Sequence, residues 1–307
     1  MKMTGSGQKS LTEAPKDLKE AIDWVLRVSG GDGYGGSDVI KLVEALKECD
    51  VINVYNLYNN LQSHINTLAN ALKNFIGYAP SGTSGSDFKI DIGGNGIITK
   101  GNIYSRRQGS PRSQNKKYTS AYYGAAWGLN VEIGYVGQKQ DNKKKALQSF
   151  LTAIQIIFER LTELYLKCKT EWKSNKLDGS SGGTGLKQFM EKNGFDNTQL
   201  NTTMTGEQII SKAFTSFTEF SKAYTAVSSN PSLDTFRYQL QKNAWSNPSN
   251  YPLSALYILA TPAYSETSIT TFKASIATLG ATALAGGAYA LNLGGFATSL
   301  NSFFGFT

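Results

Sequence analysis

The 307-residue sequence predicts a mainly α-helical protein: a multi-helix bundle with a long loop region and an apolar C-terminal helical segment. Three observations lead to this prediction. Apolar residues recur every three or four positions in several stretches, which is the spacing of one helix face. That spacing is lost over residues 78–142, where Gly, Ser, Asn and Lys are frequent, and no charged residue follows Lys273. With 40% hydrophobic residues, the chain can form a substantial core and is not disordered throughout.

The first predicted helix lies within LTEAPKDLKEAIDWVLRVSGGDG, residues 11–33. Its apolar stripe consists of Leu18, Ala21, Ile22, Val25 and Leu26. Pro15 suits the first turn of a helix, where a backbone N–H would have no partner. Trp24 lies beside the stripe and should anchor its packing, and Gly30 and Gly31 form a stop signal. We expect this helix to face the core.

Two further helices complete the predicted N-terminal part, residues 1–77. Ser37 or Asp38 can cap a helix that ends near Glu48. The next runs from about Val51 to Ile76, with apolar residues in a regular three-to-four rhythm.

Residues 78–142 form the predicted irregular and exposed loop region, since a long run without periodicity is typical of a functional loop. Within it, FKIDIGGNGIITKGNIY alternates enough for a short hairpin, and NVEIGYVG could form one more strand. The local basic groups, such as Arg106 and Arg107, predict a solvated loop. No nucleic-acid-binding fold is recognisable around them.

The C-terminal helical part, residues 143–265, belongs to the same predicted bundle. Its strongest helix covers residues 143–172 and is apolar on more than one side. The remaining helices are expected at about 186–192, 206–228 and 231–245, followed by a short apolar helix bracketed by Pro248, Pro252 and Pro262.

The uncharged end, residues 274–307, is a candidate membrane segment. The residues that we assign to it are Ile276, Leu279, Gly286, Gly287, Leu291, Leu293, Gly294, Gly295 and Phe296. The stretch is long enough to cross a bilayer, and its glycines would let helices approach closely. The alternative is a buried apolar hairpin broken at one of the Gly-Gly pairs. The polar N-terminus lacks the apolar region of an ordinary signal peptide.

Residues with chemistry are few, so we expect no enzyme, no metal and no cofactor. The two cysteines, Cys49 and Cys168, could form a disulfide with each other or remain free thiols. His64 is the single histidine, and we expect it to be partly exposed on its helix, without metal-ligand spacing around it. No phosphate-binding or nucleophile motif is found. The net charge of +8 suits an anionic membrane or another acidic partner.

Several blocks resemble the variant erythrocyte surface antigens of Babesia parasites. They are PKDLKEAIDWVLRVSGGDG, LTELYLKCK, GLKQFMEKNGFDNTQLN, TGEQIISKAF, PSLDTFRYQLQKNAWSNPSNYPLSALYILATPAY and LAGGAYALNLGGF, and they stand in family order. The family's Cys-rich central region has no counterpart here: the corresponding stretch, at about residues 118–145, contains no Cys. The resemblance therefore indicates a shortened or divergent member.

The resemblance implies a parasite protein that is displayed on the infected erythrocyte, contributes to antigenic variation and could adhere to host endothelium. It also implies a C-terminal membrane anchor. As partners we expect related surface antigens, in a hetero- or homo-oligomer. The host receptor is unknown, and an adhesive function that resides in the Cys-rich part is in doubt for this chain. The alternative interpretation is a soluble or peripheral assembly partner of larger surface antigens.

Overall fold

The computed structural model describes residues 9–31, 37–48, 60–77, 87–89, 96–97, 103–105, 121–122, 136–177, 184–196, 200–201, 203–227 and 230–261. The described part is mainly helical, as predicted. Its α-helices are α1 (Leu18–Val28), α2 (Val39–Glu48), α3 (Leu61–Ile76), α4 (Val136–Lys169), α5 (Thr184–Lys192), α6 (Gly206–Gln208), α7 (Thr218–Thr225), α8 (Leu233–Ser246) and α9 (Pro252–Ala260). A π-helical turn, η3 (Ile209–Ala213), follows α6, and a 3-10 turn, η4 (Pro248–Asn250), precedes α9.

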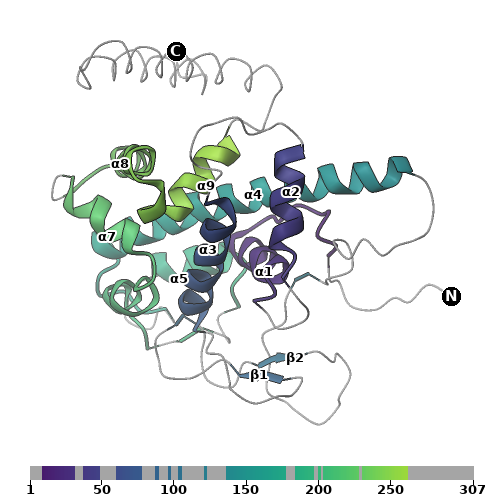
Figure 1. Cartoon of the computed structure of the whole chain (residues 1–307). Coiled ribbons are helices and arrows are strands. Elements are labelled where there is room, and N and C mark those ends of the chain that lie inside the picture. Colours follow the sequence, from purple (N-terminus) through teal and green to yellow (C-terminus); the bar gives the residue numbers. More distant parts are fainter. Residues whose placement is uncertain are drawn as a thin grey trace, which may run out of the picture.

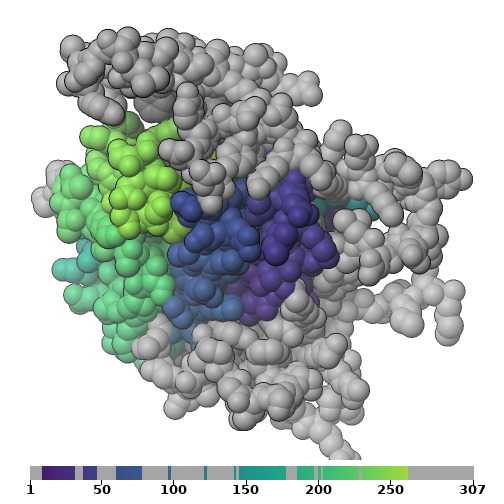
Figure 2. Space-filling view, viewed as in Figure 1, coloured from purple at the N-terminus to yellow at the C-terminus, as the bar shows by residue number. Residues whose placement is uncertain are grey.

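The long helix α4 is the central element of the fold (Figure 1). Helices α1, α2, α8 and α9 all pack against it, and α3 packs against α1, α2 and α9. Their apolar faces share one buried cluster, to which α4 contributes Phe150, Ile154, Phe158, Leu161 and Tyr165. The N-terminal and C-terminal helices therefore form one core, as Figure 2 shows by their adjacent coloured surfaces.

Helix α1 begins later than the sequence predicts. The Asp17 carboxylate accepts a hydrogen bond from the backbone N–H of Glu20 at 2.9 Å, so Asp17 is the N-cap and Pro15 precedes the helix. The placement of Pro15 in the first turn is thus wrong, because the cap lies two residues after it. The end is as predicted: Gly30 adopts the left-handed conformation, with φ of 67°.

Helix α2 and the described part of the predicted third helix, α3, agree with the helices expected from the apolar spacing. The backbone N–H of Val39 donates to the Ser37 hydroxyl at 3.3 Å at the start of α2. Helix α3 ends at Gly77, which has φ of 88°. The first ten residues of the predicted third helix, before Leu61, lie outside the described residues except for Asn60.

The single helix predicted at 206–228 is divided into α6, the π-helical turn and α7. The apolar spacing of this stretch is compatible with one continuous helix, so the pattern does not reveal the break. Contacts between aromatic side chains stabilise the break between α6 and α7. Phe214 lies 5.4 Å from Phe75 and 5.2 Å from Tyr165, measured between ring centroids. The next helix follows the prediction: α8 is capped by the Ser232 side chain.

The loop region ends earlier than predicted, because α4 already begins at Val136. Its first turns have the polar sequence VGQKQDNKKK, in which Gln and Lys are good helix formers without apolar periodicity. Strand β1 (Asp87–Lys89) pairs with antiparallel β2 (Ile103–Ser105), and the pair extends one residue beyond each end of the stretch 88–104 that was expected to form a short hairpin. Residues 130–135 of the further expected strand lie outside the described residues.

The candidate membrane segment, 274–307, also lies outside the described residues. Within the described part, the helices are all too short or too polar to span a bilayer.

Candidate functional site

The region between α3 and α4 returns to the helical core at two described points. The first is Gly96–Ile97. The Ile97 side chain is buried, its N–H donates to the carbonyl of Phe75 at 3.0 Å, and its carbonyl accepts from the N–H of Asn201 at 2.7 Å. Gly96 lies so close to Gly77 that a β-carbon at position 96 would clash with the backbone. This contact ties the region to the end of α3 and to the segment before α6.

The second point is Ala121–Tyr122, which lies between the N-terminal segment and α1. The carbonyl of Ala121 accepts from the backbone N–H of Lys9 at 2.7 Å. The N–H of Ala121 donates to the Asp23 carboxylate at 2.9 Å. Tyr122 is fully buried, and its hydroxyl donates to the carbonyl of Glu13 at 3.1 Å. Ala121 and Tyr122 are therefore hydrogen-bonded both to the N-terminal segment and to α1.

Two acidic side chains of α1, Asp23 and Glu20, take part in the contacts around Ala121 and Lys9. Asp23 is buried and pairs with Lys19 at 2.8 Å, while Glu20 pairs with Lys9 at 2.6 Å. Burial raises the pKa of Glu20, but hydrogen bonds from Lys9 and from the N–H of Lys16 outweigh it, and the net result is a lowered pKa. Glu20 is therefore ionised at neutral pH, which preserves its pairing with Lys9.

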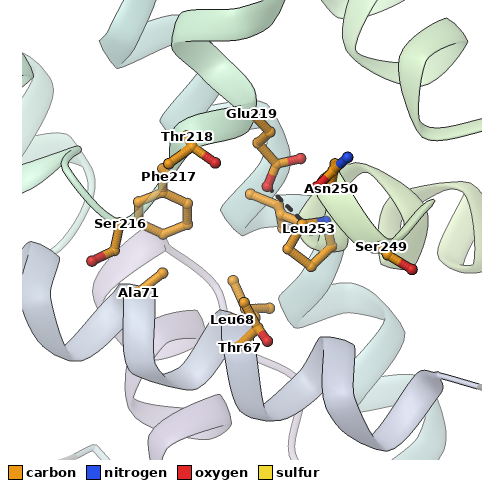
Figure 3. A pocket seen from close by; sticks show the side chains of 11 residues that line it. Thr67, Leu68, Ala71, Ser216, Phe217, Thr218, Glu219, Ser249, Asn250 and Leu253 are labelled. Atoms are coloured by element: carbon orange, nitrogen blue, oxygen red, sulfur yellow. Dashed lines mark hydrogen bonds between the residues drawn. The ribbon is translucent and has the colours of Figure 1, made fainter. Parts of the chain in front are cut away.

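A small pocket of about 110 Å³ lies between α3, the start of α7, η4 and the start of α9 (Figure 3). Its apolar walls include Leu68, Phe217 and Leu253, and Glu219 forms part of its lining. One water takes up about 30 Å³ of the bulk liquid, so the pocket has room for several waters or a small polar group.

Glu219 is a buried acidic group in the lining of this pocket. It is fully buried, and its carboxylate accepts from the N–H of Leu253 at 3.2 Å and from the N–H and hydroxyl of Ser254 at 3.1 and 2.6 Å. Burial raises its pKa to about 7, against the hydrogen bonds from Ser254 and Leu253 and the charge of Lys222, which lower the pKa. The side chain thus caps the N-terminus of α9 from another helix.

Of the predicted site residues, only His64, on α3, and Cys168, on α4, lie in the described part of the chain. His64 was expected to be partly exposed, and this is wrong: it is 3% exposed, because α3 packs into the core against α1, α2 and α9. Neither ring nitrogen of His64 has a hydrogen-bond partner in the described structure, and burial lowers its pKa. Cys168 is a buried free thiol whose pKa burial raises, and Cys49 lies outside the described residues.

Among the described residues, no group of three His, Cys, Asp or Glu side chains could hold a metal ion. The sequence interpretation missed Glu219 and the contacts of Asp23. For Glu219 a signal exists: the acidic residue stands between Phe217 and Phe220, both at apolar spacing. For Asp23 there is none, because its partner Ala121 is 98 positions away.

Comparison of the chain with protein-family models, with curated proteins and with solved structures gives no match in any of the three. Function is therefore inferred from the sequence and from the geometry of the described residues.

Proposed function

We propose that this protein is a non-enzymatic, membrane-anchored surface antigen of infected erythrocytes, whose helical frame displays residues 78–135 to the host. In this role it contributes to antigenic variation, with adhesion to host endothelium as a further contribution. The observation that supports the proposal best is the return of this region to the core at Ile97 and at Ala121–Tyr122.

These two points, with the end of α3 and the start of α4, divide the region into three segments: 78–95, 98–120 and 123–135. The first two segments start and end next to positions that contact the described core, and the third runs from Tyr122 to the start of α4. Sequence changes within a segment can then leave the buried contacts in place, as surface loops generally tolerate variation better than the elements they connect. Such a design suits a surface that changes under immune selection.

The described chemistry is compatible with a non-enzymatic role. Cys168 and His64, which could act as a nucleophile and a base, are both buried, and they lie on different helices. Burial raises the pKa of the Cys168 thiol and lowers the pKa of the His64 imidazole, so it favours the neutral form of each group. The uncharged residues 274–307 and the net charge of +8 favour a membrane anchor and an anionic membrane surface.

The display is tested with an epitope tag inserted after Ser113, in infected erythrocytes that express the full chain. We expect an antibody to detect the tag on intact cells, and carbonate extraction to leave the protein in the membrane. Deletion of residues 262–307 should release it. A tag that is detected only after permeabilisation would contradict surface display, and release of the full chain by carbonate would favour the peripheral assembly partner.

The frame is tested separately with the purified full chain. A tag after Ser113 should leave the thermal unfolding temperature unchanged, because it lies between the two held points. The same tag between Gly96 and Ile97 should lower that temperature, because it separates Ile97 from its contacts with Phe75 and Asn201. Equal destabilisation by both insertions would show that residues 98–120 are part of the core.

A further inference from the structure

The pocket beside Glu219 combines a buried carboxyl group, apolar walls and a polar rim. Thr67, Thr218, Ser249 and Asn250 contribute to its lining and are exposed, so they form the rim. Figure 3 shows the carboxylate of Glu219 next to Leu253, with Phe217 and Leu68 across the pocket. A ligand that suits this space has a positively charged donor at one end and a short apolar stem.

The hydrogen bonding of Glu219 leaves room for such a donor. Its Oε2 accepts two hydrogen bonds from Ser254, whereas its Oε1 accepts one from the N–H of Leu253. A carboxylate oxygen can accept two, so Oε1 has capacity for one more. Within the described residues no Lys, Arg or His side chain forms an ion pair with Glu219; Lys222, on the next turn of α7, acts on it only through its field.

A buried carboxylate without a paired cation is costly, and a bound cation would offset part of that cost. We propose that this pocket binds a primary alkylammonium group, with the ammonium donating to Oε1 of Glu219 and the alkyl stem against Phe217 and Leu68. The group could be a free small amine or the end of a lysine side chain of another protein. This inference is independent of the proposed surface display.

The full chain is titrated calorimetrically at pH 8, where Glu219 is mostly ionised. The ligands are n-butylammonium, which represents a free amine, and Nα-acetyl-lysine methylamide, which represents a protein side chain. The neutral n-butanol and the Nε-acetylated lysine derivative are the controls. We expect saturable binding of one or both cations and none of the neutral compounds. Binding of only one cation supports the proposal and identifies the source of the group.

Two pairs of variants locate the site. Glu219→Gln should weaken cation binding by about ten-fold or more, as expected for the loss of a charge-assisted hydrogen bond, whereas Glu207→Gln, at an exposed position outside the pocket, should not. Thr67→Leu should narrow the pocket mouth and abolish binding, whereas Asn66→Leu, the exposed neighbour on α3, should have no effect. Position 67 is exposed, so this variant remains informative if Glu219→Gln fails to fold.

The proposal is overturned if the wild-type chain binds neither cation. It is equally overturned if n-butanol binds as well as n-butylammonium, or if Thr67→Leu and Asn66→Leu bind alike. In those cases the pocket holds water and Glu219 is only a helix cap.

Discussion

Helices α1 and α9 both pack against α4, but they are held in different ways. Helix α1 has its own N-cap, Asp17, and its charged side chains pair around a buried apolar stripe. Helix α9 begins with Pro252, and Tyr251 at its N-cap position makes no side-chain cap. Every residue from Leu253 to Ala260 is buried. Its cap is Glu219, from a different helix.

The difference shows how two short helices of similar length obtain their stability. The local sequence of α1 already contains a cap, an apolar stripe and a stop signal. Helix α9 depends on its surroundings: Tyr257 stacks on Phe158 with ring centroids 3.9 Å apart, and its hydroxyl donates to Glu159 at 2.7 Å. Glu159 also pairs with Arg237 of α8. Variants that remove one support from each helix can test this comparison.

The largest effect is expected at Trp24, the buried anchor of α1. Trp24→Ala should lower the free energy of unfolding by about 3–5 kcal/mol, the usual cost of removing a large buried ring. The side chain is fully buried, lies 5.7 Å from the ring of Phe150 and donates to the carbonyl of Leu11 at 3.0 Å. Urea denaturation measures the change. Trp24→Phe, which keeps a ring but loses the donor, should cost less, and equal losses would mean that packing contributes little.

The next largest loss of stability is expected at Glu219, which caps α9 from another helix. Glu219→Ala leaves two buried N–H groups, of Leu253 and Ser254, without their acceptor. Since each such group costs about 1–3 kcal/mol, we expect a loss of about 3 kcal/mol in the free energy of unfolding. Urea denaturation at pH 8 provides the measurement. A loss smaller than that of Asp17→Ala would contradict the view that α9 depends more on its cap than α1 does.

A pH dependence follows from the buried position of Glu219. Its pKa is raised from 4.5 to about 7 in the folded chain. Between these values the folded state keeps a proton that the unfolded state has lost, so the free energy of unfolding falls as pH rises, by on the order of 3 kcal/mol. Burial lowers the pKa of His64 below its ordinary value of 6.5, so below pH 6.5 the unfolded state binds this proton more readily than the folded state. The contribution of His64 to the free energy of unfolding therefore falls as pH falls, opposite to that of Glu219.

The two contributions are separated by comparing the wild-type chain with Glu219→Gln at pH 5 and pH 8. The advantage of the wild-type chain over the variant should be larger at pH 5, because the variant keeps the His64 contribution and loses only that of Glu219. An advantage that is the same at both pH values would place the pKa of Glu219 near its ordinary value.

The local cap of α1 should have a smaller effect. Asp17→Ala removes the acceptor for the N–H of Glu20 and should lower the free energy of unfolding by about 1 kcal/mol, as is typical for an N-cap. Asp17→Ser, which can still cap, is the matched control. The two variants are compared by thermal unfolding, and equal destabilisation would show that the hydrogen bond of the cap is not what Asp17 contributes.

An effect of similar size but of opposite sign is expected at His64. Because both ring nitrogens lack partners in the described structure, His64→Leu should raise the free energy of unfolding at pH 7 by about 1 kcal/mol. The matched substitution at an exposed position of α3, Gln62→Leu, should leave stability nearly unchanged. Destabilisation by His64→Leu would indicate that the imidazole binds a group outside the described residues.

Local patterns predicted much of the frame. Helix α1, the start of α2 and the cap of α8 follow from side chains within a few residues of each element, such as Ser37 and Ser232. The apolar face of α4 was visible as well. Its polar first turns were not, because a helix without an apolar stripe has no periodicity to detect, and the break before α7 was hidden by spacing that fits a continuous helix.

The sequence by itself determined that the described part of the chain is mainly helical, where most of its helices lie and that few residues have catalytic spacing. These properties depend on periodicity and on caps, which act over a few residues. The tertiary structure decided the burial of His64, the capping of α9 by Glu219 and the return of the chain to the core at Ile97 and Tyr122. Each of these features depends on contacts between groups that are far apart in the sequence. Short-range patterns of apolar and capping residues carry no information about such contacts.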